Sequence, residues 1–84
     1  MPEGRRSRLD IYASVLRAVK DASRKTHIVY EAKLNFKRCQ EYLSELKENG
    51  LVKIESQSPL TWVITEDGEQ FLDKYEQVRE LIPR

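Results

Sequence analysis

The sequence predicts an α+β fold in which three helices come first, two short strands follow, and a last helix ends the domain. Apolar residues recur at steps of three and four from residue 7 to residue 49. An alternating pattern rich in β-branched residues replaces them from residue 51 to residue 64, and helical spacing returns after residue 65. With 84 residues, the whole chain is expected to form a single domain, residues 1–84.

The first helix is expected to begin after Ser7 and to continue to about Ala22. Ser7 and Asp10 have the spacing of a capping box, in which each side chain bonds the backbone of the other residue. A wide apolar stripe follows, which must pack on more than one element: Leu9, Ile11, Tyr12, Val15, Leu16, Ala18 and Val19. Residues 1–6 before this helix are expected to form a flexible basic arm.

Two short helices joined by a tight turn are predicted between Thr26 and Leu51. Thr26 is a suitable N-cap for the first of them, which turns at Lys33 and Leu34. Asn35 is expected to cap the second, and Asn49-Gly50 to end it, because both residue types tolerate the left-handed conformation. The apolar face of this second helix is predicted to consist of Phe36, Cys39, Tyr42, Leu43 and Leu46.

A β-hairpin is predicted next, with strands at Leu51–Ser56 and Thr61–Ile64. Trp62 and Ile64 share one face of the second strand and are expected to cover the helices. Thr65 then caps a last helix over residues 66–82. The apolar residues of this helix are spaced four, three and four, which predicts a homodimer interface: Phe71, Tyr75, Val78 and Ile82.

Composition argues against several classes of protein. The sequence has no glycine-rich phosphate loop, no cluster with metal-ligand spacing and no converging catalytic set, so neither an enzyme nor a cofactor is expected. The single cysteine, Cys39, is expected to be a buried apolar residue, and the single histidine, His27, a surface residue. No apolar run is long enough to cross a membrane, and we expect a cytoplasmic, nucleoid-associated protein.

The charges are segregated along the chain although the net charge is only +1. Met1 to Gln40 carries ten Lys and Arg against four Asp and Glu, which gives +6, and Glu41 to Arg84 carries five against ten, which gives −5. The basic half contains the first two helices and the start of the third. A basic surface of this kind is typical of nucleic-acid binding, although charges also simply solvate helices.

The element order is that of a winged helix-turn-helix, whose second short helix, here Asn35 to Asn49, enters the major groove of double-stranded DNA. The residues predicted to contact DNA are Arg24, Lys25, Lys37, Arg38, Gln40, Glu41 and Ser44. Arg24 and Lys25 lie at a helix N-terminus, where backbone N–H groups already favour phosphate. Phosphate contacts are also predicted from the N-terminal arm, through Arg5, Arg6 and Arg8.

Part of the chain, from Leu9 to Leu72, resembles a known family. The residues that carry the resemblance are Thr26, Ile28, Tyr30 and Ala32, then Gly50 and Leu51, then Ile64, Thr65 and Gly68. They are similar to those of the archaeal small winged-helix DNA-binding proteins that dimerise through a C-terminal antiparallel coiled coil. The resemblance implies a protein that binds double-stranded DNA as a chromatin protein or a transcriptional regulator.

A second hypothesis is a winged helix that contacts proteins without binding DNA directly. It is favoured by the near-neutral net charge and by the acidic Glu41 and Glu45 on the proposed recognition helix. The predicted wing tip, Glu55 to Leu60, also has no Lys or Arg.

Overall fold

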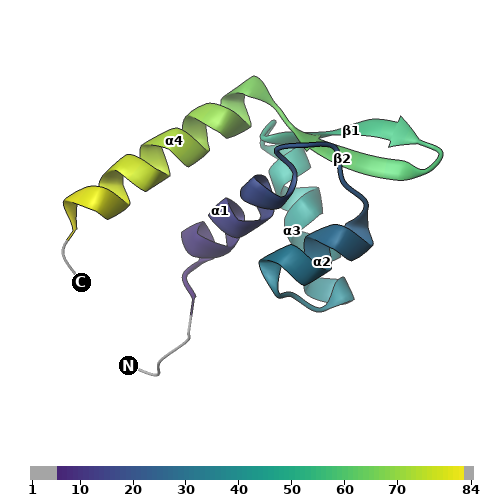
Figure 1. Cartoon of the computed structure of the whole chain (residues 1–84), viewed down its shortest axis with the longest axis horizontal. Coiled ribbons are helices and arrows are strands. Elements are labelled where there is room, and N and C mark those ends of the chain that lie inside the picture. The colour runs from purple at the N-terminus through teal and green to yellow at the C-terminus, as the bar shows by residue number, and fades with distance from the viewer. Residues whose placement is uncertain (1–5, 83–84) are drawn as a thin grey trace.

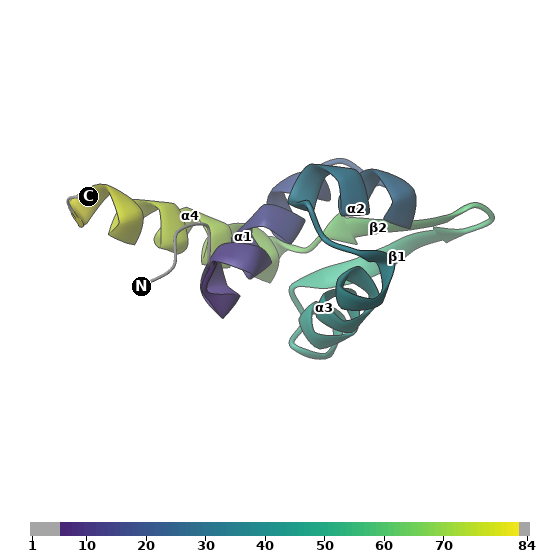
Figure 2. The same ribbon diagram turned by 90° about the horizontal axis from the view of Figure 1, so that it is seen from below.

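The structure, a computed structural model, describes residues 6–82. It confirms the predicted order of elements: α1 (Arg8–Ala18), α2 (Lys25–Ala32), α3 (Phe36–Glu48), β1 (Val52–Gln57), β2 (Leu60–Ile64) and α4 (Glu66–Leu81). α1 contacts all three other helices, and α4 runs beside it (Figure 1). The antiparallel β1–β2 hairpin projects from the opposite end of the molecule to the end of α4, with α2 and α3 between them (Figure 2).

The core is built around α1. This helix buries Ile11, Ala13, Val15, Leu16 and Ala18, which confirms most of its predicted apolar stripe. Leu9 is an exception, because it lies in the first turn, is 53% exposed and only lines a shallow pocket with residues of α4. None of the helices in the described part of the chain has the length and apolar character that crossing a bilayer requires.

α1 is shorter than predicted and ends at Ala18 instead of Ala22. The residues after it pair with β2 instead of continuing the helix. The carbonyl of Val19 accepts the backbone N–H of Ile64 at 2.9 Å, and Ser23 and Trp62 exchange two backbone hydrogen bonds of 2.9 and 2.8 Å. The edge of β2 is thereby satisfied, and Trp62 is held against the helices.

The end of α3 is connected directly to the hairpin. Gly50 adopts a φ of 77°, and the backbone N–H groups of Gly50 and Leu51 bond the carbonyls of Lys47 and Leu46 at 3.0 and 2.8 Å. This is the Schellman arrangement expected from the Asn49-Gly50 pair. In the hairpin that follows, Val52 pairs with Ile64 and Ile54 with Trp62, so their side chains share the face that covers the helices.

The start of α4 is locked onto the same junction. The Thr65 side chain accepts the N–H of Gly68 at 3.0 Å, as predicted for an N-cap, and its hydroxyl donates to the Gly50 carbonyl at 2.6 Å. The Thr65 N–H bonds the Leu51 carbonyl at 3.0 Å. At Gly68, a Cβ atom would lie 2.2 Å from the Leu51 carbonyl oxygen and 2.7 Å from Ile64 Cγ1. Only glycine therefore allows α4 to approach the hairpin this closely.

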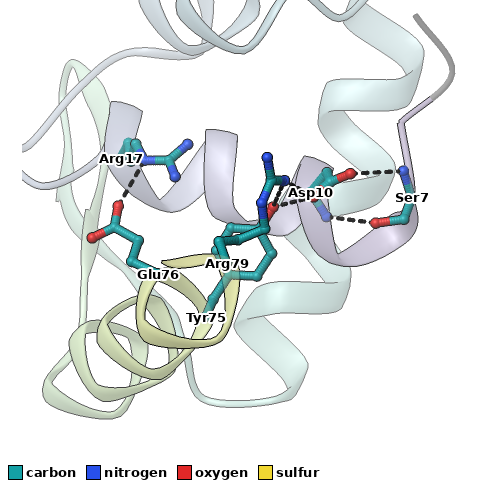
Figure 3. A network of polar contacts seen from close by, with 6 residues as sticks. All are labelled: Ser7, Asp10, Arg17, Tyr75, Glu76 and Arg79. Carbon is teal, nitrogen blue, oxygen red and sulfur yellow. Dashed lines mark hydrogen bonds and ion pairs between the residues drawn. The ribbon is translucent and has the colours of Figure 1, made fainter. Parts of the chain in front are cut away.

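Polar contacts hold α4 beside α1 (Figure 3). Asp10, which forms the predicted capping box with Ser7, also accepts hydrogen bonds from the Tyr75 hydroxyl and, at 3.1 Å, from Arg79. The hydrogen bond from Tyr75 is the main reason that the pKa of Asp10 is lowered. A second ion pair, Arg17 with Glu76 at 3.0 Å, lies further along the same two helices. These contacts set the direction of α4 relative to the rest of the domain.

We expect Gly68→Ala to destabilise the domain, although alanine is normally the better helix former. The added methyl group must displace the Leu51 carbonyl or the Ile64 side chain, and such overpacking costs about 1–3 kcal/mol. Urea unfolding measures the change, with Gln70→Ala as the control, because Gln70 is exposed on the same helix. Equal stability of the two variants would show that α4 does not approach the hairpin as closely as described.

Candidate nucleic-acid interface

The rotation of α3 about its axis determines which of its side chains face outward. Its buried side chains are Cys39, Tyr42, Leu43 and Leu46. The opposite side carries exposed residues spaced four, three and four, which form one row along the helix: Lys37, Glu41, Ser44 and Glu48. We call these four residues the outward row. Three of the predicted DNA-contacting residues, Lys37, Glu41 and Ser44, therefore face away from the core.

The prediction that Phe36 belongs to the core is wrong. Phe36 is the first residue of α3 and is 56% exposed. The buried apolar residue at this end of the helix is instead Leu34, which lies in the turn between α2 and α3 and is 8% exposed. Lys33 makes that turn possible by adopting the left-handed conformation, with a φ of 57°.

Arg38 lies on one flank of α3. Asn35 caps the helix as predicted, because its side chain accepts the Arg38 N–H at 2.7 Å. The Arg38 guanidinium is placed over the Tyr42 ring, 5.7 Å from the centroid, and donates to the Tyr42 hydroxyl at 3.4 Å. The Arg38 side chain is exposed. To bind a ligand, it would have to give up its contacts with Tyr42.

A chain of hydrogen bonds connects the start of α2 to the exposed side of α3. Lys25 donates to the Gln40 side-chain oxygen, and the Gln40 amide nitrogen donates to the Ser44 hydroxyl at 3.2 Å. The structure therefore brings together three of the predicted contact residues, which are up to 19 positions apart in sequence. Lys25 carries a positive charge to the side of α3 where the exposed polar residues lie.

The N-terminus of α2 differs in one detail from the prediction. The N-cap residue is Arg24, in an extended conformation, and not Thr26, which lies exposed inside the helix. No side chain caps this helix. The free N–H groups of its first turn remain beside Arg24 and Lys25, which is the arrangement that favours an anion.

The predicted basic arm is only partly described. Arg5 lies outside the described residues, and Arg6 donates to the Lys33 carbonyl at 3.2 Å. Arg8 is not part of an arm, because it is the first residue of α1 and forms an ion pair of 2.6 Å with Glu45 of α3. The Glu45 carboxylate raises the pKa of Arg8 and also accepts a hydrogen bond from Tyr12 at 2.8 Å.

Glu45 therefore has partners within the fold, whereas an acidic residue on a solvated helix face contacts only water. Burial and the Glu45 carboxylate raise the pKa of Tyr12, because both favour the neutral phenol that donates to Glu45. Arg8 lies 37 positions from Glu45 and Tyr12 lies 33 positions from it. No local pattern in the sequence signals this cluster.

The predicted dimer residues of α4 fall into two groups. Phe71 and Tyr75 are half-buried against α1, with the Phe71 ring 6.0 Å from the ring of Tyr12. Val78 is 52% exposed. Ile82 is 56% exposed and lies in an extended conformation directly after α4, instead of in its predicted last turn. Phe71, Tyr75 and Val78 line a shallow pocket of about 210 Å³ between α1 and α4, together with Leu9 and Lys74.

Tyr30 is an exposed aromatic residue to which the sequence analysis assigns no role. Tyr30 is 78% exposed on α2, on the opposite side of the helix from Ile28 and Ala32. Helical spacing could have indicated this, because Tyr30 falls between two buried positions two residues away on each side. Within residues 6–82, no group of three potential metal ligands occurs.

Comparison with known proteins shows the family of this chain. A family model described as winged helix-turn-helix matches residues 5–83. The uncharacterized protein MJ0290 of the archaeon Methanocaldococcus jannaschii is 31% identical over 83 residues, which are 98% of this chain. The chain spans only 38% of the length of that relative.

Solved structures of similar fold include DNA-binding proteins. Sso10a-2, a DNA-binding protein from Sulfolobus solfataricus, has a TM-score of 0.77 and 25% identity, covering 89% of this chain and 83% of its own. Two further structures, each at 16% identity, show likeness of fold alone. BpsR of Bordetella bronchiseptica has a TM-score of 0.77 over 96% of this chain and 60% of its own. ZitR of Lactococcus lactis, solved with DNA, has a TM-score of 0.57 over 99% and 68%.

The match to the family model, the archaeal relative and the likeness to Sso10a-2 agree with the resemblance found in the sequence. The chain belongs to the winged helix-turn-helix family.

Proposed function

We propose that this chain binds double-stranded DNA by placing α3 in the major groove, and that it acts as a transcriptional regulator or a chromatin-associated protein. The observation that carries the proposal is the outward row of α3, which begins with Lys37 and has Lys25 of α2 beside it through Gln40. An exposed helix with cations at its N-terminal end has the form that a helix-turn-helix presents to DNA. The description of Sso10a-2 as a DNA-binding protein supports the same conclusion.

The candidate residues have distinct roles in this proposal. Lys37, Gln40 and Ser44 can donate hydrogen bonds to base edges, and Glu41 can accept one from the amino group of cytosine. Arg38 reaches a guanine edge by giving up its contacts with Tyr42. Arg24 and Lys25 bind phosphates at the start of α2, which orients the protein without reading sequence.

The arm contributes less than the sequence alone would indicate. Arg6 and Arg8 retain the charge to attract phosphate, but Arg8 is paired with Glu45 and would have to exchange that partner. Arg5 has the same predicted role. Long-range attraction to DNA therefore rests mainly on Arg24 and Lys25 at the start of α2 and on Lys37 in the outward row.

The proposal includes a homodimer formed through α4. Val78 is exposed and lines a pocket with the apolar residues Leu9, Phe71 and Tyr75, and Ile82, four residues after Val78, is also exposed. Apolar surface of this kind is removed from water when the same helix of a second copy packs on it. Two copies would present two α3 helices to successive turns of the duplex.

The second candidate function is a protein-contact module. Glu41 and Glu48 favour it, since two of the four residues of the outward row are acidic and would lie near phosphates in a DNA complex. DNA binding requires the cations of α3, Lys37 and Arg38, whereas the protein-contact function does not require them.

We expect Lys37→Glu/Arg38→Glu to abolish detectable DNA binding without changing the melting temperature by more than a few degrees. The two changes remove cations and add anions at the proposed contact surface, whereas neither side chain belongs to the buried face of α3. Fluorescence anisotropy with a labelled duplex at 50 mM and 200 mM salt provides the measurement, since phosphate-driven binding weakens steeply over about this range.

The matched control compares single variants, Lys37→Glu against Lys20→Glu. Both make the same change in net charge, but Lys20 lies two residues after the end of α1, next to residues of α4. Lys37→Glu should weaken binding at least tenfold more than Lys20→Glu. Equal effects would mean that α3 does not contact the DNA, and the protein-contact function would then be favoured.

We expect Val78→Asp to convert the dimer to a monomer. A charge at this exposed apolar position must be desolvated if α4 packs on a second copy. Sedimentation velocity at micromolar concentration measures the change. Gln77→Asp is the control, because it introduces the same charge one residue away on the same helix. A wild type that sediments as a monomer, or a Val78→Asp variant that remains a dimer, would refute this interface.

A further inference from the structure

The exposed apolar side chains of the described residues fall into separate groups. Leu9 lies on α1, Val78 and Leu81 lie on α4 and Ile82 directly follows it, where the proposed dimer covers part of them. Leu60 and Tyr30 lie on the hairpin and α2. Among the described residues of α3, Phe36 is the only large apolar side chain that is exposed. The position of this phenylalanine at the tip of the proposed recognition helix therefore needs its own explanation.

Phe36 lies among polar and cationic groups. It is the first helical residue after the Asn35 cap. The next residue is Lys37, with which the outward row begins. Phe36, Gln40 and Ser44 follow at steps of four, so they form a row along one side of the helix. Gln40 in that row is bonded to Lys25 of α2. A partner that covers Phe36 must therefore tolerate, or use, the positive charges around it.

From this placement we infer that Phe36 reads thymine. The inference rests on the proposed DNA binding by α3 and names a specificity determinant within it. In the major groove the only apolar group on a base-pair edge is the 5-methyl group of thymine, and phenylalanine is one of the side chains that contact it. The surrounding cations match the phosphates of the same duplex. Phe36 thus favours A·T pairs opposite the first turn of α3.

The test compares two duplexes that differ only in that methyl group. Alternating poly(dA-dT) and alternating poly(dA-dU) have the same phosphate charge and the same hydrogen-bonding edges, and no target sequence needs to be known. The wild-type protein should bind the thymine duplex at least about fourfold more tightly, which corresponds to burial of one methyl group. Phe36→Ala should bind both duplexes equally.

Two control variants separate a thymine contact from general effects. Tyr30→Ala removes another exposed aromatic residue, from α2, and should keep the wild-type preference. Phe36→Leu retains an apolar side chain and should also prefer the thymine duplex. Circular dichroism melting checks that each variant is folded.

The possible failures are distinguishable. A wild type that binds both duplexes equally, or a Phe36→Ala variant that retains the full preference, overturns the thymine contact and leaves DNA binding by α3 intact. A folded wild type that binds neither duplex at low salt overturns the proposed function and the thymine contact together.

Discussion

The rotation of α3 about its own axis is the constraint on which the candidate interface depends. Cys39, Leu43 and Leu46 are fully buried and Tyr42 is nearly so, and no other rotation of the helix would bury these four side chains together. Lys37, Glu41 and Ser44 are exposed as a direct consequence. The surface proposed to meet DNA is thus determined by the apolar residues behind it, which is how a packed core usually positions a binding surface in a small domain.

Both ends of α3 are held by contacts that maintain this rotation. Asn35 caps the first turn, and Gly50 and Leu51 close the last turn onto the hairpin. The same Leu51 carbonyl bonds Thr65 and limits the space at Gly68, so the position of α4 depends on the end of α3. The contacts of Asp10 with Tyr75 and Arg79 then align α4 with α1. A proposed dimer formed through α4 would therefore inherit a defined geometry between its two α3 helices.

The fold was predictable from the sequence because its signals are local. The capping residues Ser7, Asn35 and Thr65 and the glycine after α3 all act within a few residues of their positions, and the structure confirms each of them. Some of the errors concern interactions between distant segments, whereas the wrong N-cap of α2, Arg24 instead of Thr26, and the exposure of Phe36 are local. α1 ends early because Val19 and Ser23 pair with β2, and Phe36 is exposed because Leu34 is the buried apolar residue at that end of α3. The Arg8–Glu45 and Lys25–Gln40 contacts likewise join helices whose relative placement a linear pattern does not contain. Which candidate residues touch DNA remains a prediction, since helix spacing shows only which of them face outward.

The most direct test of the account is a map of the residues whose surroundings change when DNA is added. Titration of the ¹⁵N-labelled protein with a short duplex, followed by two-dimensional NMR at moderate salt, reports on each backbone amide separately. We expect the largest shifts in residues 36–44 of α3 and in Arg24 and Lys25 at the start of α2, with little change along the acidic residues Glu69 and Asp73 of α4. Shifts concentrated on α4 or on the hairpin, with α3 unaffected, would contradict the account.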